Sequence, residues 1–100
     1  MTRSVVWSAT AAEHLESIAL YVATVSPVYA LRLVDRILAH IDHVAAFPES
    51  GRAVPEARDP NVREVFEGPY RIMYLAQATR VDILAIIHGR RHVAWPPGQP

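Results

Sequence analysis

Two short apolar runs near the end of the chain have the pattern of β-strands. They cover residues 70–76 and 81–87 and are rich in β-branched and aromatic residues, which favour extended backbone. Four residues, Gln77-Ala78-Thr79-Arg80, separate them, which is the length of a hairpin connection. The pattern predicts an antiparallel hairpin, so the start of the first strand and the end of the second should meet at one end of the sheet.

The first half of the chain has the periodicity of two amphipathic helices. Thr10 has capping-box spacing to Glu13, so the first helix is expected to begin near Thr10. Ser26-Pro27 offers an N-cap followed by proline at the first helical position, and Pro48 should end the second helix. The two helices are therefore expected to form a hairpin that serves as scaffold. Its apolar stripes are Leu15, Ile18, Val22 and Val25, then Ala30, Val34, Ile37, Ile41 and Val44.

The remaining segments complete a single domain over residues 1–100. Residues 4–7 form a short strand candidate, 48–61 are dense in turn formers, and 62–66 resume strand character before a turn at 67–69. A proline-rich tail from about residue 93 cannot continue a strand and is expected to be loose. The element order predicts an α+β fold: an N-terminal strand, a two-helix hairpin and a three-stranded antiparallel meander, with the helices on one face of the sheet.

The apolar content bears on both burial and location. Hydrophobic residues make up 51% of the chain, so it either buries an unusually large share of its surface or leaves an apolar patch for a partner. The longest uncharged segment, Ser17–Leu31, is interrupted by Ser26-Pro27 and is shorter than the roughly 20 residues that span a bilayer. The N-terminus lacks the apolar core of a secretory signal, and cysteine is absent. We expect a cytoplasmic protein without a membrane helix.

The cations are unevenly placed. All ten are arginine: three stand in residues 1–50 against five acids, and seven in residues 51–100 against five acids. Arginine without lysine is compatible with a GC-rich genome. It is equally compatible with phosphate or carboxylate partners, which planar guanidinium groups bind well. Composition does not separate these two readings.

Charged residues should gather at one end of the predicted sheet. Arg71 begins the first strand of the hairpin, and His88-Gly89-Arg90-Arg91-His92 follows the second strand. Arg71 is expected to be exposed there, and the alternative is an ion pair with Glu64 or Glu67. No metal or other cofactor is expected, because the pair His40 and His43 lacks a third ligand nearby.

Six motifs follow one another along the chain: the Trp/Ala-rich start of the first helix, Ser26-Pro27, residues 47–56, Val62-Arg63-Glu64, Tyr70-Arg71-Ile72-Met73-Tyr74 and His88-Gly89-Arg90-Arg91. In their order and spacing these motifs resemble the RelE/ParE superfamily of toxins from bacterial type II toxin–antitoxin systems. The resemblance covers nearly the whole chain and implies the same α+β fold. It is closer to the ParE-like branch, because the helical hairpin is long and His88 to Arg91 resembles the His-x-Arg stretch of that branch.

The resemblance implies a growth-inhibiting, plasmid-stabilising toxin that poisons DNA gyrase and is held inactive in a hetero-oligomer by a ParD- or RelB-like antitoxin. The alternative is a RelE-like endoribonuclease that cuts messenger RNA on the ribosome. In that case Arg71, Arg91 and His92 would be the catalytic residues. The lysine pair of many RelE-like members has no counterpart here, because lysine is absent. The residues expected to bind the target or the antitoxin are Arg52, Arg63, Arg71, His88, Arg90 and Arg91.

Overall fold

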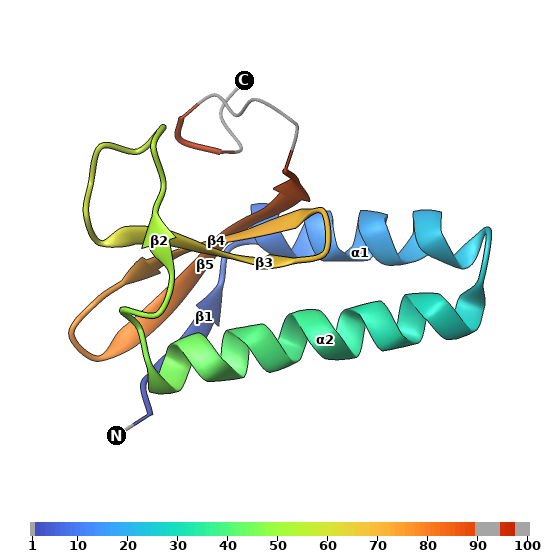
Figure 1. The fold of residues 1–100 in the computed structure, drawn as a ribbon, viewed down its shortest axis with the longest axis horizontal. Coiled ribbons are helices and arrows are strands. Elements are labelled where there is room, and N and C mark those ends of the chain that lie inside the picture. Colours follow the sequence, from blue (N-terminus) through green and yellow to red (C-terminus); the bar gives the residue numbers. More distant parts are fainter. Residues whose placement is uncertain (1, 90–94, 98–100) are drawn as a thin grey trace.

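The computed structural model describes residues 2–89 and 95–97 and has the predicted α+β order (Figure 1). A strand and two helices come first, and four more strands follow. The elements are β1 (Ser4–Trp7), α1 (Ala9–Ala23), α2 (Pro27–Ala46), β2 (Arg52–Ala53), β3 (Val62–Glu67), β4 (Tyr70–Ala76) and β5 (Arg80–His88).

The strands form one five-stranded sheet in the order β1-β5-β4-β3-β2. The predicted meander β3-β4-β5 is confirmed, with antiparallel partners such as Val65 and Ile72. Strand β1 lies parallel to β5, whereas the other strand pairs among the described residues are antiparallel. Strand β2 lies inside the segment predicted to be irregular, and its two residues pair with Glu64 and Arg63 of β3.

Side-chain caps fix where the helices begin. Helix α1 begins at Ala9 because the Ser8 hydroxyl accepts the Ala11 amide hydrogen at 3.0 Å, so the expected start at Thr10 is one residue late. Helix α2 begins at Pro27, and the Ser26 hydroxyl accepts from the Tyr29 amide at 3.1 Å. The second start confirms the prediction, since serine before proline supplies both a cap and a compatible φ.

The main core lies between the helices and one face of the sheet. The side chains of Ile72 and Tyr74 on β4 point to this face, and Ile37 of α2 is fully buried against it. This confirms the helix-two stripe at its centre. The cluster contains Ala11, Leu33, Ile37, Ile41, Val44, Ile72, Tyr74, Val81, Ile83 and Ile86.

A smaller core lies on the opposite face of the sheet. The buried residues Val54, Val62, Met73, Ala85 and Ile87 form it, with Ala57, Leu75, Leu84 and Trp95 packed around them. The segment between β2 and β3 therefore covers this face. Because Trp95 packs here, the tail predicted to be loose is docked at that residue.

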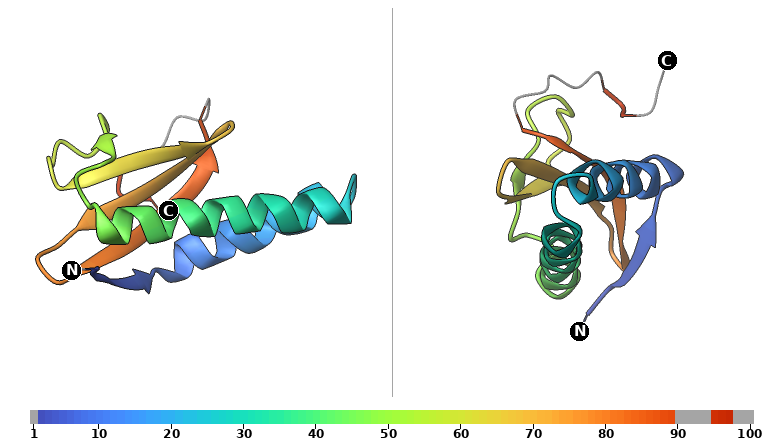
Figure 2. Two further views of the ribbon diagram at one scale, coloured as in Figure 1. Left: turned by 60° about the horizontal axis from the view of Figure 1, so that its bottom comes forward. Right: turned by 90° about the vertical axis from the view of Figure 1, so that its right-hand side faces the viewer.

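The helical hairpin continues past the end of the sheet. In Figures 1 and 2 both helices run on beyond the turn between β3 and β4. Val25, expected in the buried stripe of the first helix, is 85% exposed because α1 ends at Ala23 and Val25 lies in the turn between the helices. The apolar periodicity therefore extends two residues past the actual end of the helix. Of the helices in residues 2–89, neither is long and apolar enough to cross a membrane.

Candidate functional site

Arg71 is the centre of a charged network on the face of the sheet opposite the helices. Its Nε donates to Glu64 Oε1 at 2.6 Å, and its two terminal nitrogens donate to the two carboxylate oxygens of Glu56, each at 2.9 Å. The Arg71 side chain is only 7% exposed. The expectation of an exposed Arg71 is therefore wrong, and the ion-pair alternative is correct for Glu64.

The alternation of β4 explains this placement. Tyr70, Ile72 and Tyr74 face the helices, so Arg71 and Met73 must face the other side. There the segment after β2 brings Glu56 over the guanidinium group and shields it from solvent. Glu67, the other candidate partner of Arg71, lies on the helical side.

The network extends through Glu64 to the surface. The Glu64 side chain is 0% exposed, and its second oxygen accepts from Arg52 Nε at 2.8 Å. Arg52 is largely exposed, and its guanidinium lies 5.0 Å from the Phe66 ring centre. Two acids and two arginines thus alternate, so each buried charge has an opposite neighbour, as burial requires.

The chemistry open to this network is limited. Hydrogen bonds from Arg71 to Glu56, the largest effect, and to Glu64 together raise the pKa of Arg71 despite its burial, so the group stays charged. Because both carboxylates already hold its donors, Arg71 is not free to bind a phosphate. The network is suited to clamping the segment after β2 onto the sheet.

Arg63 also has a structural role. Its guanidinium donates to the Gly51 carbonyl at 2.8 Å and to the Glu49 carbonyl at 3.4 Å. Gly51 is tightly enclosed, because a Cβ there would come within 2.5 Å of the Tyr74 hydroxyl. Arg63 therefore holds the segment before β2, which leaves Arg52 as the exposed cation of the two.

His88 lies at the end predicted to be functional. It is the last residue of β5, is exposed, and its ring meets the edge of the Tyr70 ring at 6.0 Å between centroids. The other members of the basic cluster, Arg90, Arg91 and His92, lie outside the described residues.

Sequence reasoning missed two polar residues beside the outer edge of β5. The Ser8 hydroxyl donates to the Leu84 carbonyl at 3.2 Å, and His14 Nδ1 accepts the Ile86 amide hydrogen at 3.2 Å. Strand β1 pairs with β5 only as far as Ile83, so Ser8 and His14 supply hydrogen bonds to the backbone groups of β5 that follow. No motif identifies them, because helical periodicity gives the face of a residue but not its strand partner.

A pocket of about 280 Å³ lies between α1 and the end of the sheet that holds Tyr70 and His88. Its walls are largely apolar or aromatic, with histidine and hydroxyl groups among them. A volume near the lower limit for ligand pockets suits one or two side chains better than a cofactor. The lining residues are His14, Ser17, Ile18, Tyr21, Tyr70, Ile86, Ile87 and His88.

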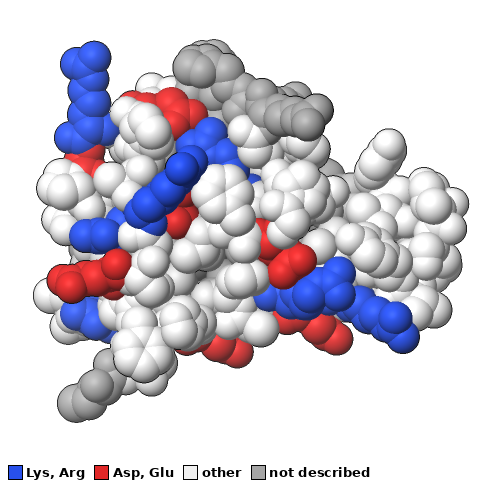
Figure 3. Space-filling model, viewed as in Figure 1, with Lys and Arg blue, Asp and Glu red and all other residues white. Residues whose placement is uncertain are grey.

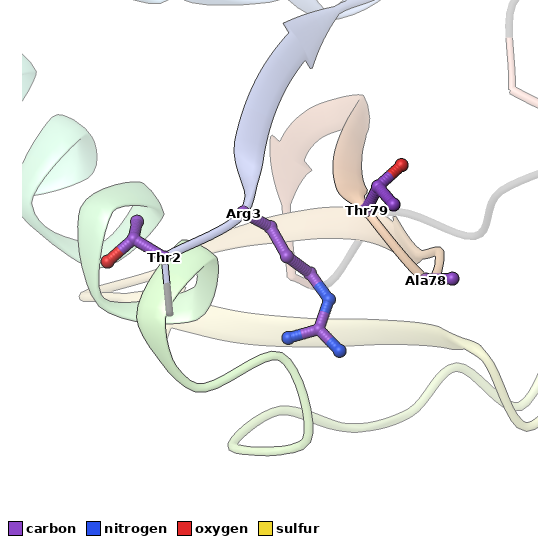
Figure 4. A pocket seen from close by; sticks show the side chains of 4 residues that line it. All are labelled: Thr2, Arg3, Ala78 and Thr79. Carbon is purple, nitrogen blue, oxygen red and sulfur yellow. The ribbon is translucent and has the colours of Figure 1, made fainter.

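Two further places offer no catalytic chemistry. His40 Nε2 lies 3.0 Å from Glu67 Oε1, and no group of three metal-ligating side chains occurs within residues 2–89 and 95–97. A hollow of about 440 Å³ is lined by Thr2, Arg3, Ala78 and Thr79 (Figure 4). Its one cation, Arg3, donates through Nε to the Gln77 carbonyl at 3.0 Å. These contacts join secondary-structure elements.

Comparison with known proteins defines the class. The model of the family described as "ParE toxin of type II toxin-antitoxin system, parDE" matches residues 5–93. A Sinorhizobium fredii protein named "Putative toxin Y4kP" is 34% identical over 92 residues, covering 90% of each chain. The chain therefore belongs to the ParE family of type II toxin–antitoxin toxins.

A solved structure has the same fold. It is described as "Chromosomal ParDE TA system from P. aeruginosa" and superposes with a TM-score of 0.69. The match covers 87% of this chain and 96% of the other, at 24% sequence identity. At this identity the likeness concerns the fold alone.

Proposed function

We propose that this toxin inhibits growth by poisoning DNA gyrase and that a cognate ParD- or RelB-like antitoxin neutralises it in the cytoplasm. Membership of the ParE family supports the toxin role and implies an antitoxin partner. The RelE-like alternative requires a cationic site that holds and polarises RNA phosphate.

The burial of Arg71 is the main argument for gyrase rather than messenger RNA as the target. In the nuclease alternative Arg71 would contact the scissile phosphate together with Arg91 and His92. Its guanidinium is instead paired with Glu64 and Glu56. A phosphate would have to displace a carboxylate that is bound through two hydrogen bonds, which favours a toxin acting through protein contacts.

The antitoxin is expected to combine acidic and apolar groups. Arg52 and His88 are exposed cationic or titratable groups at the sheet, and the helical hairpin carries exposed apolar side chains. A segment that is disordered when free and folds on binding could cover both kinds of surface. Arg90 and Arg91 remain candidates for the same contacts.

Induction of the toxin without its antitoxin tests the target. Gyrase poisoning should produce filamentous cells and an SOS response, whereas cleavage of messenger RNA should stop translation abruptly and leave codon-positioned cuts. Arg52→Ala should weaken inhibition without unfolding the chain, because Arg52 is the exposed member of the network. Arg36→Ala, which removes an exposed arginine of α2 paired with Glu67, is the matched control.

Purified components separate the two targets directly. The toxin should inhibit supercoiling by gyrase and increase the amount of cleaved DNA held by the enzyme. It should leave messenger RNA on programmed ribosomes intact. Codon-positioned cuts with unaffected gyrase would contradict the proposal and assign the chain to the nuclease group.

A further inference from the structure

A histidine of α1 completes the hydrogen bonding of the last strand. His14 Nδ1 accepts the Ile86 amide hydrogen at 3.2 Å, and the His14 side chain is half-buried. Strand β1 pairs with β5 only as far as Ile83. The imidazole therefore supplies the acceptor that a neighbouring strand supplies elsewhere in the sheet.

This hydrogen bond fixes the protonation state of the ring. A backbone amide only donates, so Nδ1 must carry a lone pair rather than a hydrogen. The neutral ring then has its hydrogen on Nε2, and a second proton can bind only at Nδ1. Protonated His14 would direct an N–H group at the Ile86 N–H group, so the bond would be lost.

The bond is important because the rest of the contact between α1 and β5 is apolar. Ala11 and Ile18 lie three and four residues from His14 on the same face of α1, and both pack in the core that contains Ile86. Within the described part of the chain, the His14 bond is the one hydrogen bond that joins a residue of α1 to the sheet. Protonation would remove this directional contact and place a charge at a half-buried position.

The surroundings of His14 do not favour a charged ring. The titratable side chains that line the same pocket are Tyr21 of α1, Tyr70 of β4 and His88 of β5. No carboxylate is among the described residues that line this pocket. The acids of α1, Glu13 and Glu16, are exposed. On the face shown in Figure 3 the charged side chains gather over the sheet and α2, and the surface over α1 is white.

We propose that His14 is a pH-sensitive link between α1 and β5. The neutral ring holds α1 on the strand, and the protonated ring releases the Ile86 amide. An opened chain takes up this proton near pH 6.5, the ordinary value of about 6.5 for histidine, whereas the closed junction takes it up less readily. The junction should therefore weaken as pH falls below about 6.5 and stay constant well above it. The inference is independent of the proposed function, because it concerns the isolated chain.

Nuclear magnetic resonance of the full-length chain tests the proposal. The nitrogen resonances of neutral His14 should show the hydrogen on Nε2. The protection of the Ile86 amide against hydrogen exchange, relative to the intrinsic rate at each pH, should fall roughly tenfold between about pH 7.5 and about pH 5. The Ile72 amide, in the middle of the sheet, should keep its protection over this range.

Two variants separate His14 from the other histidine of the pocket. His14→Asn places an amide oxygen near the position of Nδ1, which can accept from Ile86 without titrating, so the protection of Ile86 should no longer depend on pH. His88→Asn should retain the dependence. The proposal is overturned if neutral His14 carries its hydrogen on Nδ1, or if the protection of Ile86 in the parent chain does not change with pH. It is also overturned if His14→Asn keeps the dependence or His88→Asn abolishes it.

Discussion

The two faces of the sheet are stabilised in different ways. On the helical face, large aliphatic side chains pack around Ile37, and burial of each contributes about 1.5–3 kcal/mol. The other face holds a smaller apolar cluster and, in addition, a buried arginine that is paired with two carboxylates. The first arrangement tolerates adjustment because dispersion and hydrophobic burial have no direction. The second depends on the buried arginine Arg71, because without it the buried Glu64 loses its closest partner, and an unpaired buried charge is costly.

The comparison also separates residues that a partner could reach from residues that it could not. The residues of the helical core are buried, so a partner cannot contact them and they serve as scaffold. On the opposite face Arg52 is largely exposed, so a change at this residue can alter the surface without dismantling the fold. A set of substitutions on the two faces makes this difference measurable.

The largest effect is expected for Ile37→Asp in the helical core. Ile37 is 0% exposed, so the substitution buries a carboxylate with no partner, at a cost of roughly 5 kcal/mol or more against a total of about 5–15. Circular dichroism during urea unfolding should show a chain that is largely unfolded in buffer. Leu31→Asp, on the exposed part of the same helix, should change stability by less than about 0.5 kcal/mol. Equal stability of the two variants would mean that α2 packs differently.

A smaller but still large loss is expected for Arg71→Ala. It leaves Glu64 buried without its closest partner and releases Glu56, a change that typically costs about 3–5 kcal/mol. The midpoint of urea denaturation should fall accordingly. Arg36→Ala breaks a partly exposed pair with Glu67 and should cost less than about 1 kcal/mol. An unchanged midpoint for Arg71→Ala would restore the interpretation of an exposed functional arginine.

An intermediate effect is expected for Tyr74→Phe, which links the helical core to the segment before β2. The Tyr74 hydroxyl accepts from the Gly51 amide at 2.9 Å and donates to the Pro48 carbonyl at 2.8 Å. Its removal leaves both backbone groups without this partner and should cost about 1–3 kcal/mol. Thermal melting measures the loss, and hydrogen exchange at the Gly51 amide should accelerate. Tyr21→Phe, at the exposed end of α1, should melt like the parent chain.

The smallest effect concerns pH. Burial first, and then the phenols of Tyr29 and Tyr21, raise the pKa of Tyr70 above its usual 10.0. Below pH 10 both folded and unfolded chains hold this proton. At higher pH the unfolded chain loses it first, so stability should fall as pH rises toward the folded pKa. Urea unfolding should show that the free energy of unfolding declines less with pH in Tyr70→Phe than in the parent chain. A decline should persist in the variant, because burial also raises the pKa of Tyr74. An identical decline in both proteins would contradict this assignment.

Local patterns were enough for most of the fold. The caps and stripes placed both helices, with α1 beginning one residue earlier than expected because Ser8 caps it. Alternating apolar residues placed the meander, and the turn at residues 67–69 follows from Gly68, which has φ +53°. The two residues of β2 escaped notice because such a short strand has no periodicity of its own.

The candidate site was harder to predict. The cations Arg52, Arg63 and Arg71 look alike in sequence, yet one is exposed, one holds a loop carbonyl and one is buried. Glu56, which encloses Arg71, stands fifteen positions away in a segment without regular pattern. The role of Glu56 depends on the path of that segment across the sheet, and no local sequence pattern predicts this path.

The sequence by itself determined the order of the elements, the helix caps, the face of each apolar residue and the family, because these depend on local propensity, periodicity and motif order. Only the tertiary structure decided how far each face is covered. Helix α1 ends before it reaches Val25, so a residue with core periodicity lies in an exposed turn. The segment after β2 crosses Arg71, so a charged residue is buried. Coverage depends on contacts between residues distant in sequence, and that is why the pattern of a single stretch could not reveal it.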